Sequence, residues 1–167
     1  MRVASSGKEF ENILGHKLFF TEGISGAVKE IMSILKPRTA EWQGTWALYD
    51  IFKKLYSSDN GPAVMFCLYP ETDIDSVVKD YDHVIIDDAY QYFHARDWTP
   101  FLKYKNVTIM RTFSKAFGLA GLRIGYAVGN KELKNILQKL KIPWSVSNVA
   151  QNAASAAICY HPFLDKS

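Results

Sequence analysis

One lysine-containing segment combines the residue types that could hold a phosphorylated aldehyde. Residues 111–126 contain Lys115, two small hydroxyl residues just before it and three glycines after it. An unprotonated lysine amine can attack an aldehyde, and burial beside a cation such as Arg123 lowers a lysine pKa toward that state. The hydroxyls of Thr112 and Ser114 can bind phosphate oxygens, and Arg123 adds a bidentate guanidinium. By itself, a lysine in a loop is more simply a solvated charge.

An aspartate ends an apolar run upstream of this segment. Residues 83–87 read His-Val-Ile-Ile-Asp, which predicts a buried strand ending in the carboxylate of Asp87. Ligands of open α/β sheets bind beyond the carboxyl ends of the strands, where Asp87 and the loop after Met110 would both lie. A carboxylate there could pair with a protonated pyridine nitrogen, which makes such a ring an electron sink. Taken alone, Asp87 or Asp88 is more simply a cap of the following turn.

Two further segments offer contacts to a flat, phosphorylated ligand. Residues 21–27 join a predicted strand to a predicted helix and contain two glycines. The free N–H groups and dipole of such a helix start suit a phosphate, which makes Ile24 and Ser25 candidate ligands. In the next predicted helix, Trp46 or Tyr49 could stack on a ring, although, without the other motifs, packing of an amphipathic helix into the core is the simpler explanation.

The elements that must position these residues alternate between strands and helices. Apolar runs predict strands at residues 17–22, 63–68, 83–87, 106–110 and 122–128. Helical periodicity predicts helices at residues 25–35, 45–56, 73–81, 131–140 and 149–159. This alternation predicts an α/β fold of three layers, a mostly parallel sheet with helices on both faces. The strand at 122–128 could run antiparallel, because its connection to the preceding strand is short.

The composition of the chain limits the partners it could bind and the cellular compartment in which it could work. The 167 residues carry a formal net charge of +3, so nothing in the charge favours nucleic acid or an anionic membrane. No apolar run reaches the ~20 residues that cross a bilayer, and residues 1–8 lack the apolar core of a secretion signal. We therefore expect a cytoplasmic protein without a metal site, in which the two cysteines are buried free thiols.

The two motifs together resemble a known family. Residues 112–126 are similar to the lysine motif of fold-type I pyridoxal-phosphate aminotransferases, most closely those of the histidinol-phosphate type. Residues 85–90 resemble the same family's strand ending in Asp-x-Ala-Tyr, with Asp87 placed 28 residues before the lysine. The resemblance implies pyridoxal 5'-phosphate, a homodimer, and amino transfer between a small amino donor and a keto or phosphorylated substrate. A decarboxylase of a phosphorylated amino acid and a non-catalytic remnant of the fold are the alternatives.

The resemblance also implies a role for each matched residue. Lys115 would form a Schiff base with the cofactor and shuttle the proton, and Asp87 would pair with the pyridine nitrogen. Tyr90 would hydrogen-bond the phenolic oxygen of the ring, and Trp46, in a segment similar to the family's Pro-Thr-Tyr, would stack on it. The phosphate would be bound by five residues: Ile24, Ser25, Thr112, Ser114 and Arg123.

The chain also departs from the family pattern. Residues 68–73 lack the asparagine that contacts the ring oxygen, and residues 37–44 lack the usual strand before the aromatic segment. Residues 15–160 correspond to the large, cofactor-binding domain, preceded by an N-terminal segment at 1–14 and followed at 161–167 by the start of a missing C-terminal part. We therefore expect the small domain, which carries the family's arginine for the substrate carboxylate, to be largely absent.

Two explanations fit this shortness. We expect that the sequence joins parts of a longer protein, with seams near 37–38, 60–61 and 69–73. A short, degenerate relative of the family is the alternative.

Overall fold

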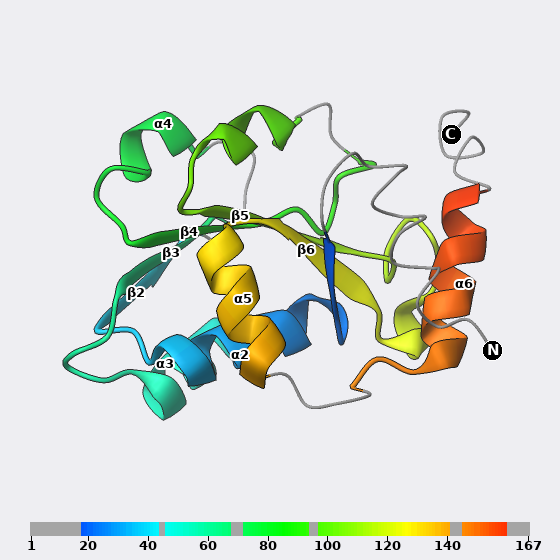
Figure 1. Cartoon of the computed structure of the whole chain (residues 1–167), viewed down its shortest axis with the longest axis horizontal. Helices are drawn as coiled ribbons and strands as arrows, with labels where there is room; N and C mark the ends of the chain where they lie inside the picture. Colours follow the sequence, from blue (N-terminus) through cyan, green and yellow to red (C-terminus); the bar gives the residue numbers. More distant parts are fainter. Residues whose placement is uncertain (1–17, 44–45, 68–71, 94–96, 141–144, 160–167) are drawn as a thin grey trace.

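A six-stranded sheet forms the centre of the part of the chain that the computed structural model describes, residues 18–43, 46–67, 72–93, 97–140 and 145–159. The strand order is β1-β6-β5-β4-β3-β2 (Figure 1). The strands are β1 (Leu18–Thr21), β2 (Thr39–Trp42), β3 (Ala63–Cys67), β4 (His83–Asp87), β5 (Val107–Thr112) and β6 (Gly125–Gly129). Neighbours from β2 to β5 run parallel, whereas β6 is antiparallel to both β5 and β1. The predicted mostly parallel α/β sheet is confirmed, and so is the antiparallel direction considered for its last strand.

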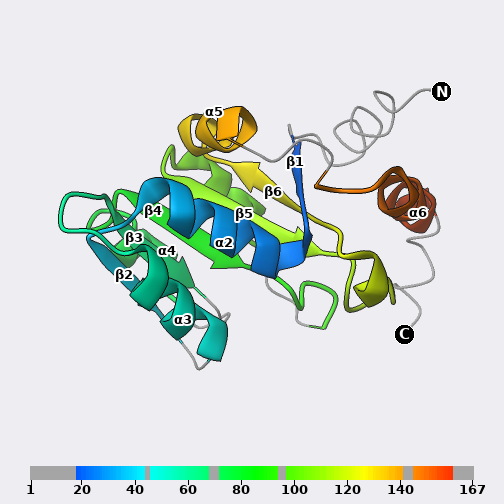
Figure 2. The same ribbon diagram turned by 90° about the horizontal axis from the view of Figure 1, so that it is seen from below.

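Helices cover both faces of this sheet, as the three-layer prediction requires. On one face pack α2 (Gly23–Leu35), α3 (Ala47–Tyr56) and α5 (Lys131–Leu140), and Figure 2 shows α2 lying between the other two. On the other face pack α4 (Ile74–Val77), the 3-10 helix η1 (Thr99–Lys103) and α6 (Asn148–Cys159). A second 3-10 turn, η2 (Ala120–Leu122), lies between β5 and β6. None of the helices in the described ranges is long and apolar enough to cross a membrane.

Alternate residues of the central strands point into two separate cores. In β4, Ile85 packs into the core of the α2 face, whereas Val84 and Ile86 pack into the core of the α6 face, and all three are fully buried. Burying each such side chain stabilises the fold by roughly 1.5–3 kcal/mol. Cys67 is a buried free thiol, as predicted, and burial raises its pKa to about 12. The side chain of Cys159 lies outside the described residues.

Helix α2 illustrates how local sequence builds one of these layers. Its apolar residues recur at helical spacing, so one face of the helix is buried: Ile24, Ala27, Val28, Ile31 and Met32. The helix ends at Lys36, which takes the left-handed conformation and donates its N–H to the Met32 carbonyl at 3.0 Å. The next residue is Pro37, which has no backbone N–H to donate and therefore cannot continue the helix.

The expectation that residues 37–44 lack a strand is wrong. Thr39–Trp42 form β2, an edge strand that pairs in parallel with β3, with Ala40 opposite Val64. The strand has only four residues, and of these only Ala40 is fully buried, so its apolar run is too short to stand out from the sequence. The strand forms because it pairs with β3, a contact distant in sequence, and not because residues 39–42 have a strong strand propensity of their own.

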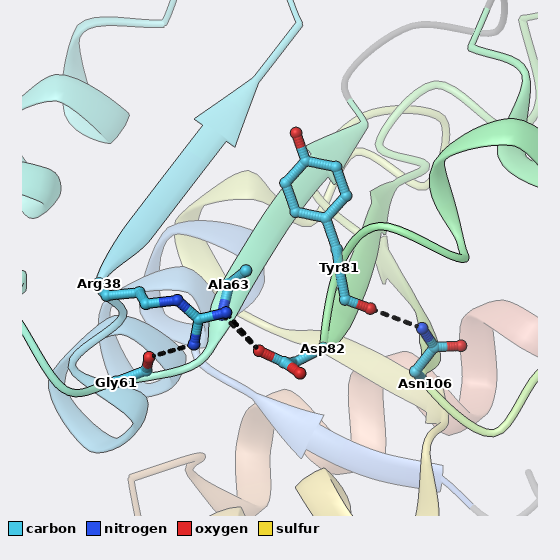
Figure 3. A network of polar contacts seen from close by, with 6 residues as sticks. All are labelled: Arg38, Gly61, Ala63, Tyr81, Asp82 and Asn106. Atoms are coloured by element: carbon cyan, nitrogen blue, oxygen red, sulfur yellow. Dashed lines mark hydrogen bonds and ion pairs between the residues drawn. The ribbon is translucent and has the colours of Figure 1, made fainter.

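A polar network holds the amino-terminal edge of the sheet together (Figure 3). Arg38, just before β2, lies with its Nη2 3.4 Å from Oδ2 of Asp82, and the N–H of Ala63 donates to the same oxygen at 2.7 Å. Asn106 Nδ2 donates to the carbonyl of Tyr81 at 2.9 Å, which joins the starts of β4 and β5. These contacts align the starts of four parallel strands, so that their carboxyl ends meet at the opposite edge.

Some predicted boundaries of helices differ from the observed ones, and some predicted domain boundaries lie outside the described residues. The helix predicted at 73–81 is shorter, Ile74–Val77, because the chain turns back toward β4 after Val77, where the Asp80 N–H donates to the Val77 carbonyl. Asp73 caps the helix by accepting the Ser76 N–H at 3.4 Å. The proposed domain boundaries next to residues 14 and 161, and most of residues 69–73, lie outside the described residues.

Candidate functional site

The carboxyl ends of the strands bring several of the predicted site residues to one edge of the sheet. Asp87, at the end of β4, lies opposite Met110 of β5. Thr112, two residues further along β5, lies opposite Gly125 of β6, and Gly125 lies opposite Thr21 at the end of β1. The structure therefore places Asp87, the loop after β5 and the start of α2 along the same edge.

The carboxylate of Asp87 is held by two hydrogen bonds. Its Oδ2 accepts the Tyr49 hydroxyl at 3.3 Å, and its Oδ1 accepts the Ala89 N–H at 3.1 Å. The pKa of Asp87 is raised from 3.8 to about 6, mainly by burial and to a smaller extent by the charge of Asp88, which together outweigh the lowering effect of the two hydrogen bonds and of Lys115. At neutral pH Asp87 is therefore an ionised carboxylate in a poorly hydrated place, which a cationic partner would stabilise.

The amine of Lys115 faces an aromatic ring at the same edge. Its Nζ lies 5.2 Å from the centroid of the Tyr90 ring, a cation–π geometry. Both side chains are exposed, so the expected burial of Lys115 beside Arg123 is wrong. The physical reason is that Lys115 sits in the turn after β5, closed by the Gly118 N–H donating to its carbonyl at 2.9 Å. The lysine amine is therefore open to a ligand.

The guanidinium of Arg123 lies instead against the start of α2. A Cβ built on Gly23, the first residue of α2, would lie 2.9 Å from Arg123 Nη2. Arg123 reaches this place from a left-handed backbone conformation (φ 47°), and its Nη1 donates to the Ala120 carbonyl at 3.1 Å. The first N–H groups of a helix have no partner within it. A guanidinium beside the N–H groups of Ile24 and Ser25 forms a cradle suited to a phosphate.

Thr112 lies one strand away from this cradle. A Cβ on Gly125, its partner in β6, would lie 3.1 Å from the Gly23 Cα and 2.6 Å from the Arg111 carbonyl oxygen. Only glycine therefore allows β6 to approach the start of α2 so closely. Thr112 is buried, and its Oγ1 accepts the Ser114 N–H at 3.0 Å, which shapes the turn that leads to the lysine.

The aromatic candidates of α3 take different positions. Trp46, just before the helix, is half-buried, and its ring packs edge-on against Tyr49 at 4.8 Å. Tyr49 is 1% exposed and contacts Asp87 directly, a role that the sequence did not indicate. The available signal was the spacing of three residues, which puts Tyr49 on the same side of the helix start as the stacking candidate Trp46. The adjoining Gly44 and Thr45 lie outside the described residues.

A buried ion pair beside the site was also missed. Asp88 is 2% exposed and its Oδ2 accepts Arg111 Nε at 3.0 Å. Burial lowers the pKa of Arg111, but the interactions with Tyr126 and Asp88 are stronger than this effect, so the pKa of Arg111 is raised. A charged residue within the apolar strand β5 was the available signal, since a buried charge requires a partner. The pair fixes the turn after Asp87 to β5.

Together these groups fit the cofactor that the resemblance implies. A phosphorylated pyridine aldehyde needs a carboxylate for its ring nitrogen, an amine for its aldehyde and a cradle for its phosphate, and Asp87, Lys115 and Arg123 offer one each. Within the described ranges, no cluster of three or more His, Cys, Asp or Glu side chains could hold a metal ion. Residues 68–71, where the family carries its asparagine, lie outside the described residues.

The fold and this edge define an α/β protein of the aminotransferase type. The family model for aminotransferase class I and II matches residues 69–166, more than half of the chain. The chain belongs to the aminotransferase class I and II family.

Individual relatives within and around this family show which proteins the chain is similar to in sequence and in structure. Histidinol-phosphate aminotransferase 1 of Bacillus cereus is 48% identical over 88 residues, which are 50% of this chain and 24% of the relative. The histidinol-phosphate aminotransferase of Sinorhizobium meliloti, solved with pyridoxal-5'-phosphate, has a TM-score of 0.80 at 20% identity and covers 97% of this chain. The L-threonine-O-3-phosphate decarboxylase of Porphyromonas gingivalis has a TM-score of 0.81 at 20% identity and covers 96%. The chain spans only 56% and 62% of those two structures, so it matches part of its relatives.

Proposed function

We propose that this chain is the cofactor-binding domain of a pyridoxal-phosphate-dependent aminotransferase. It moves an amino group between a small amino donor and a keto or phosphorylated substrate. The observation that carries the proposal is the meeting, at one sheet edge, of the Asp87 carboxylate, the open Lys115 amine and the Arg123 guanidinium beside the start of α2. Membership of the aminotransferase class I and II family supports it.

Each residue at the edge has a task in this proposal. Bound pyridoxal phosphate supplies an electron sink for the bond that breaks at the substrate carbon. Lys115 would hold the aldehyde carbon of the cofactor and carry a proton to and from the substrate carbon, and its exposed position leaves the amine accessible for both tasks. Asp87 accepts the N–H of the ring and keeps that nitrogen charged, because its carboxylate is ionised at neutral pH. Tyr90, whose ring already faces the Lys115 amine, donates its hydroxyl to the ring oxygen.

The remaining residues orient the ligand. Trp46 covers one face of the ring, supported from behind by Tyr49. The cradle at the start of α2 would hold the phosphate through a set of backbone and side-chain donors: Ile24, Ser25, Thr112, Ser114 and Arg123. A phosphate placed there is neutralised by a charged fork and by the helix dipole.

The substrate and the assembly follow the relatives. Histidinol phosphate and L-threonine-O-3-phosphate, named for the similar proteins, are both phosphorylated amino compounds. We therefore propose a substrate of this class, a cytoplasmic setting and a homodimer that completes the site. Nucleic acid and membranes play no part in this proposal.

The test compares two reactions on the same purified protein. Incubation with pyridoxal phosphate should give a new visible absorption band in the wild type, and Lys115→Ala should lose it. With a phosphorylated amino compound, transfer of the amino group that depends on a keto acid supports the aminotransferase. Release of carbon dioxide instead supports the decarboxylase alternative. No band and no cofactor binding would leave the non-catalytic remnant as the better interpretation.

A further inference from the structure

We infer that Tyr49 is a positioning residue that orients the Asp87 carboxylate toward the cofactor and holds the stacking ring of Trp46 in line with it. The inference rests on the proposed function and deepens it, since it assigns a task to a buried phenol that the resemblance does not mention. It starts from one contact: the Tyr49 hydroxyl donates to Asp87 Oδ2 at 3.3 Å, across 38 positions of the chain.

The phenol ring is locked by its neighbours. Tyr49 is 1% exposed and lies in the middle of an aromatic group. Its ring centroid is 4.8 Å from that of Trp46, 5.0 Å from that of Phe66 and 5.9 Å from that of Trp42. Two of these contacts are edge-on, an arrangement that aromatic pairs prefer. A ring held on several sides keeps its hydroxyl at one place, directly against the carboxylate.

The carboxylate is thereby gripped at both oxygens. Oδ1 accepts the Ala89 N–H at 3.1 Å, and Oδ2 accepts the phenol. With one lone pair of each oxygen engaged, the plane of the carboxylate is set and the other lone pairs remain for a ligand. The same phenol supports Trp46 through ring contact. One side chain thus sets the position of both the group for the ring nitrogen and the group for the ring face.

The charges around this pair are few among the described residues. Burial and the negative charge of Asp88 disfavour the ionised Asp87, while Lys115, the Ala89 N–H and the Tyr49 hydroxyl favour it. Tyr49 itself stays a neutral donor, because burial and the nearby Asp87 and Cys67 raise its pKa well above its usual value. Removing the hydroxyl therefore takes away one of the few groups that keep Asp87 ionised.

The experiment uses pyridoxamine 5'-phosphate as the probe, since it carries the ring, the nitrogen and the phosphate but cannot bond to Lys115. Its dissociation constant is measured by calorimetry between pH 5.5 and 8.5 for the wild type and three variants. Tyr49→Phe keeps the packed ring and removes the hydroxyl. Tyr56→Phe, on the same helix and packed against Phe52, is the matched control. Asp87→Asn reports the complete loss of the charge.

A positioning role predicts a loss of affinity that depends on pH. Loss of a hydrogen bond to a charged group should raise the Asp87 pKa by about one unit. Relative to Tyr56→Phe, binding by Tyr49→Phe should therefore weaken about eightfold at pH 5.5, about threefold at pH 6.5 and hardly at all at pH 8.5. The ratio of the two variants cancels the titration of the probe itself. Asp87→Asn should bind weakly at every pH.

The outcomes separate this inference from the function on which it rests. Equal affinities of Tyr49→Phe and Tyr56→Phe at all pH values, with normal binding by the wild type, overturn the role of Tyr49 and leave the function intact. A loss that is the same at every pH also overturns it, because that pattern reports packing alone. Failure of the wild type to bind the probe overturns the proposed function and this inference with it.

Discussion

Replacing Asp87 by asparagine should make the cofactor-free protein more stable at pH 8. Burial raises the Asp87 pKa to about 6 in the folded protein, against 3.8 as its usual value. The folded state therefore binds more protons than the unfolded state between these two pKa values, so stability falls as pH rises through this window. The difference corresponds to roughly 3 kcal/mol, and the partial exposure of the side chain reduces the expected effect to about 2 kcal/mol.

Urea unfolding at pH 8 and at pH 3.5 measures this effect. Asp87→Asn should gain about 2 kcal/mol over the wild type at pH 8 and almost nothing at pH 3.5, where the native carboxyl is protonated as well. Excess pyridoxal phosphate should stabilise the wild type by about 2.7 kcal/mol at a hundred times its dissociation constant, and the variant by much less. Asp80→Asn, at an exposed carboxylate, is the control and should stay within about 0.5 kcal/mol at both pH values.

The result that would refute the reasoning is a variant less stable than the wild type at pH 8, or a difference that does not change with pH. Either outcome means that burial does not disfavour the ionised Asp87. The ionised Asp87 carboxylate would then not be destabilised in the empty site, and a protonated pyridine nitrogen would have no such charge to stabilise.

Four further substitutions, one of them a control, test other parts of the structure. Burial lowers the pKa of His83, whose Nδ1 lies 3.0 Å from Asn130 Nδ2, so stability should fall as pH drops below about 6.5 and His83→Gln should flatten that slope in urea unfolding. Gly125→Ala should cost on the order of 2–4 kcal/mol, because its Cβ would lie 2.6 Å from a backbone oxygen, whereas Gly121→Ala, with nothing within 4 Å, should be nearly neutral. Arg123→Gln should weaken binding of pyridoxamine 5'-phosphate about tenfold or more while the free energy of unfolding changes by less than about 0.5 kcal/mol, and an unchanged affinity would contradict the phosphate cradle.

Much of the fold was predictable because it depends on local patterns. Helix α5 begins and ends at the predicted residues, 131 and 140, since Asn130 caps it by accepting the Leu133 N–H at 2.9 Å and the apolar spacing is regular. Strands β3 and β4 contain continuous buried apolar runs. Such runs are typical of strands in a sheet that is covered on both faces, so both strands were predictable. Edge strand β2 was missed, because four residues with one buried alanine carry no such run.

The site was predictable in its residue types but not in its contacts. The lysine, the aspartate and the arginine were singled out by their residue types and by the resemblance to the family motifs, and the structure places them at one edge. The expected burial of Lys115 was wrong, because the turn that carries the lysine leaves its side chain exposed. The Tyr49 contact to Asp87 depends on how α3 packs across the sheet, which no local pattern encodes.

The most direct measurement of the central claim is the position at which pyridoxal phosphate attaches to the protein. The purified protein is incubated with the cofactor, reduced with borohydride to make the bond permanent, and mapped by peptide mass spectrometry. The cofactor should be found on Lys115 Nζ in near-stoichiometric yield, and Lys115→Ala should carry none. Lys103→Ala, at an exposed lysine outside the motif, should label as the wild type does. Label spread over several surface lysines, or equal label in Lys115→Ala, would contradict the account.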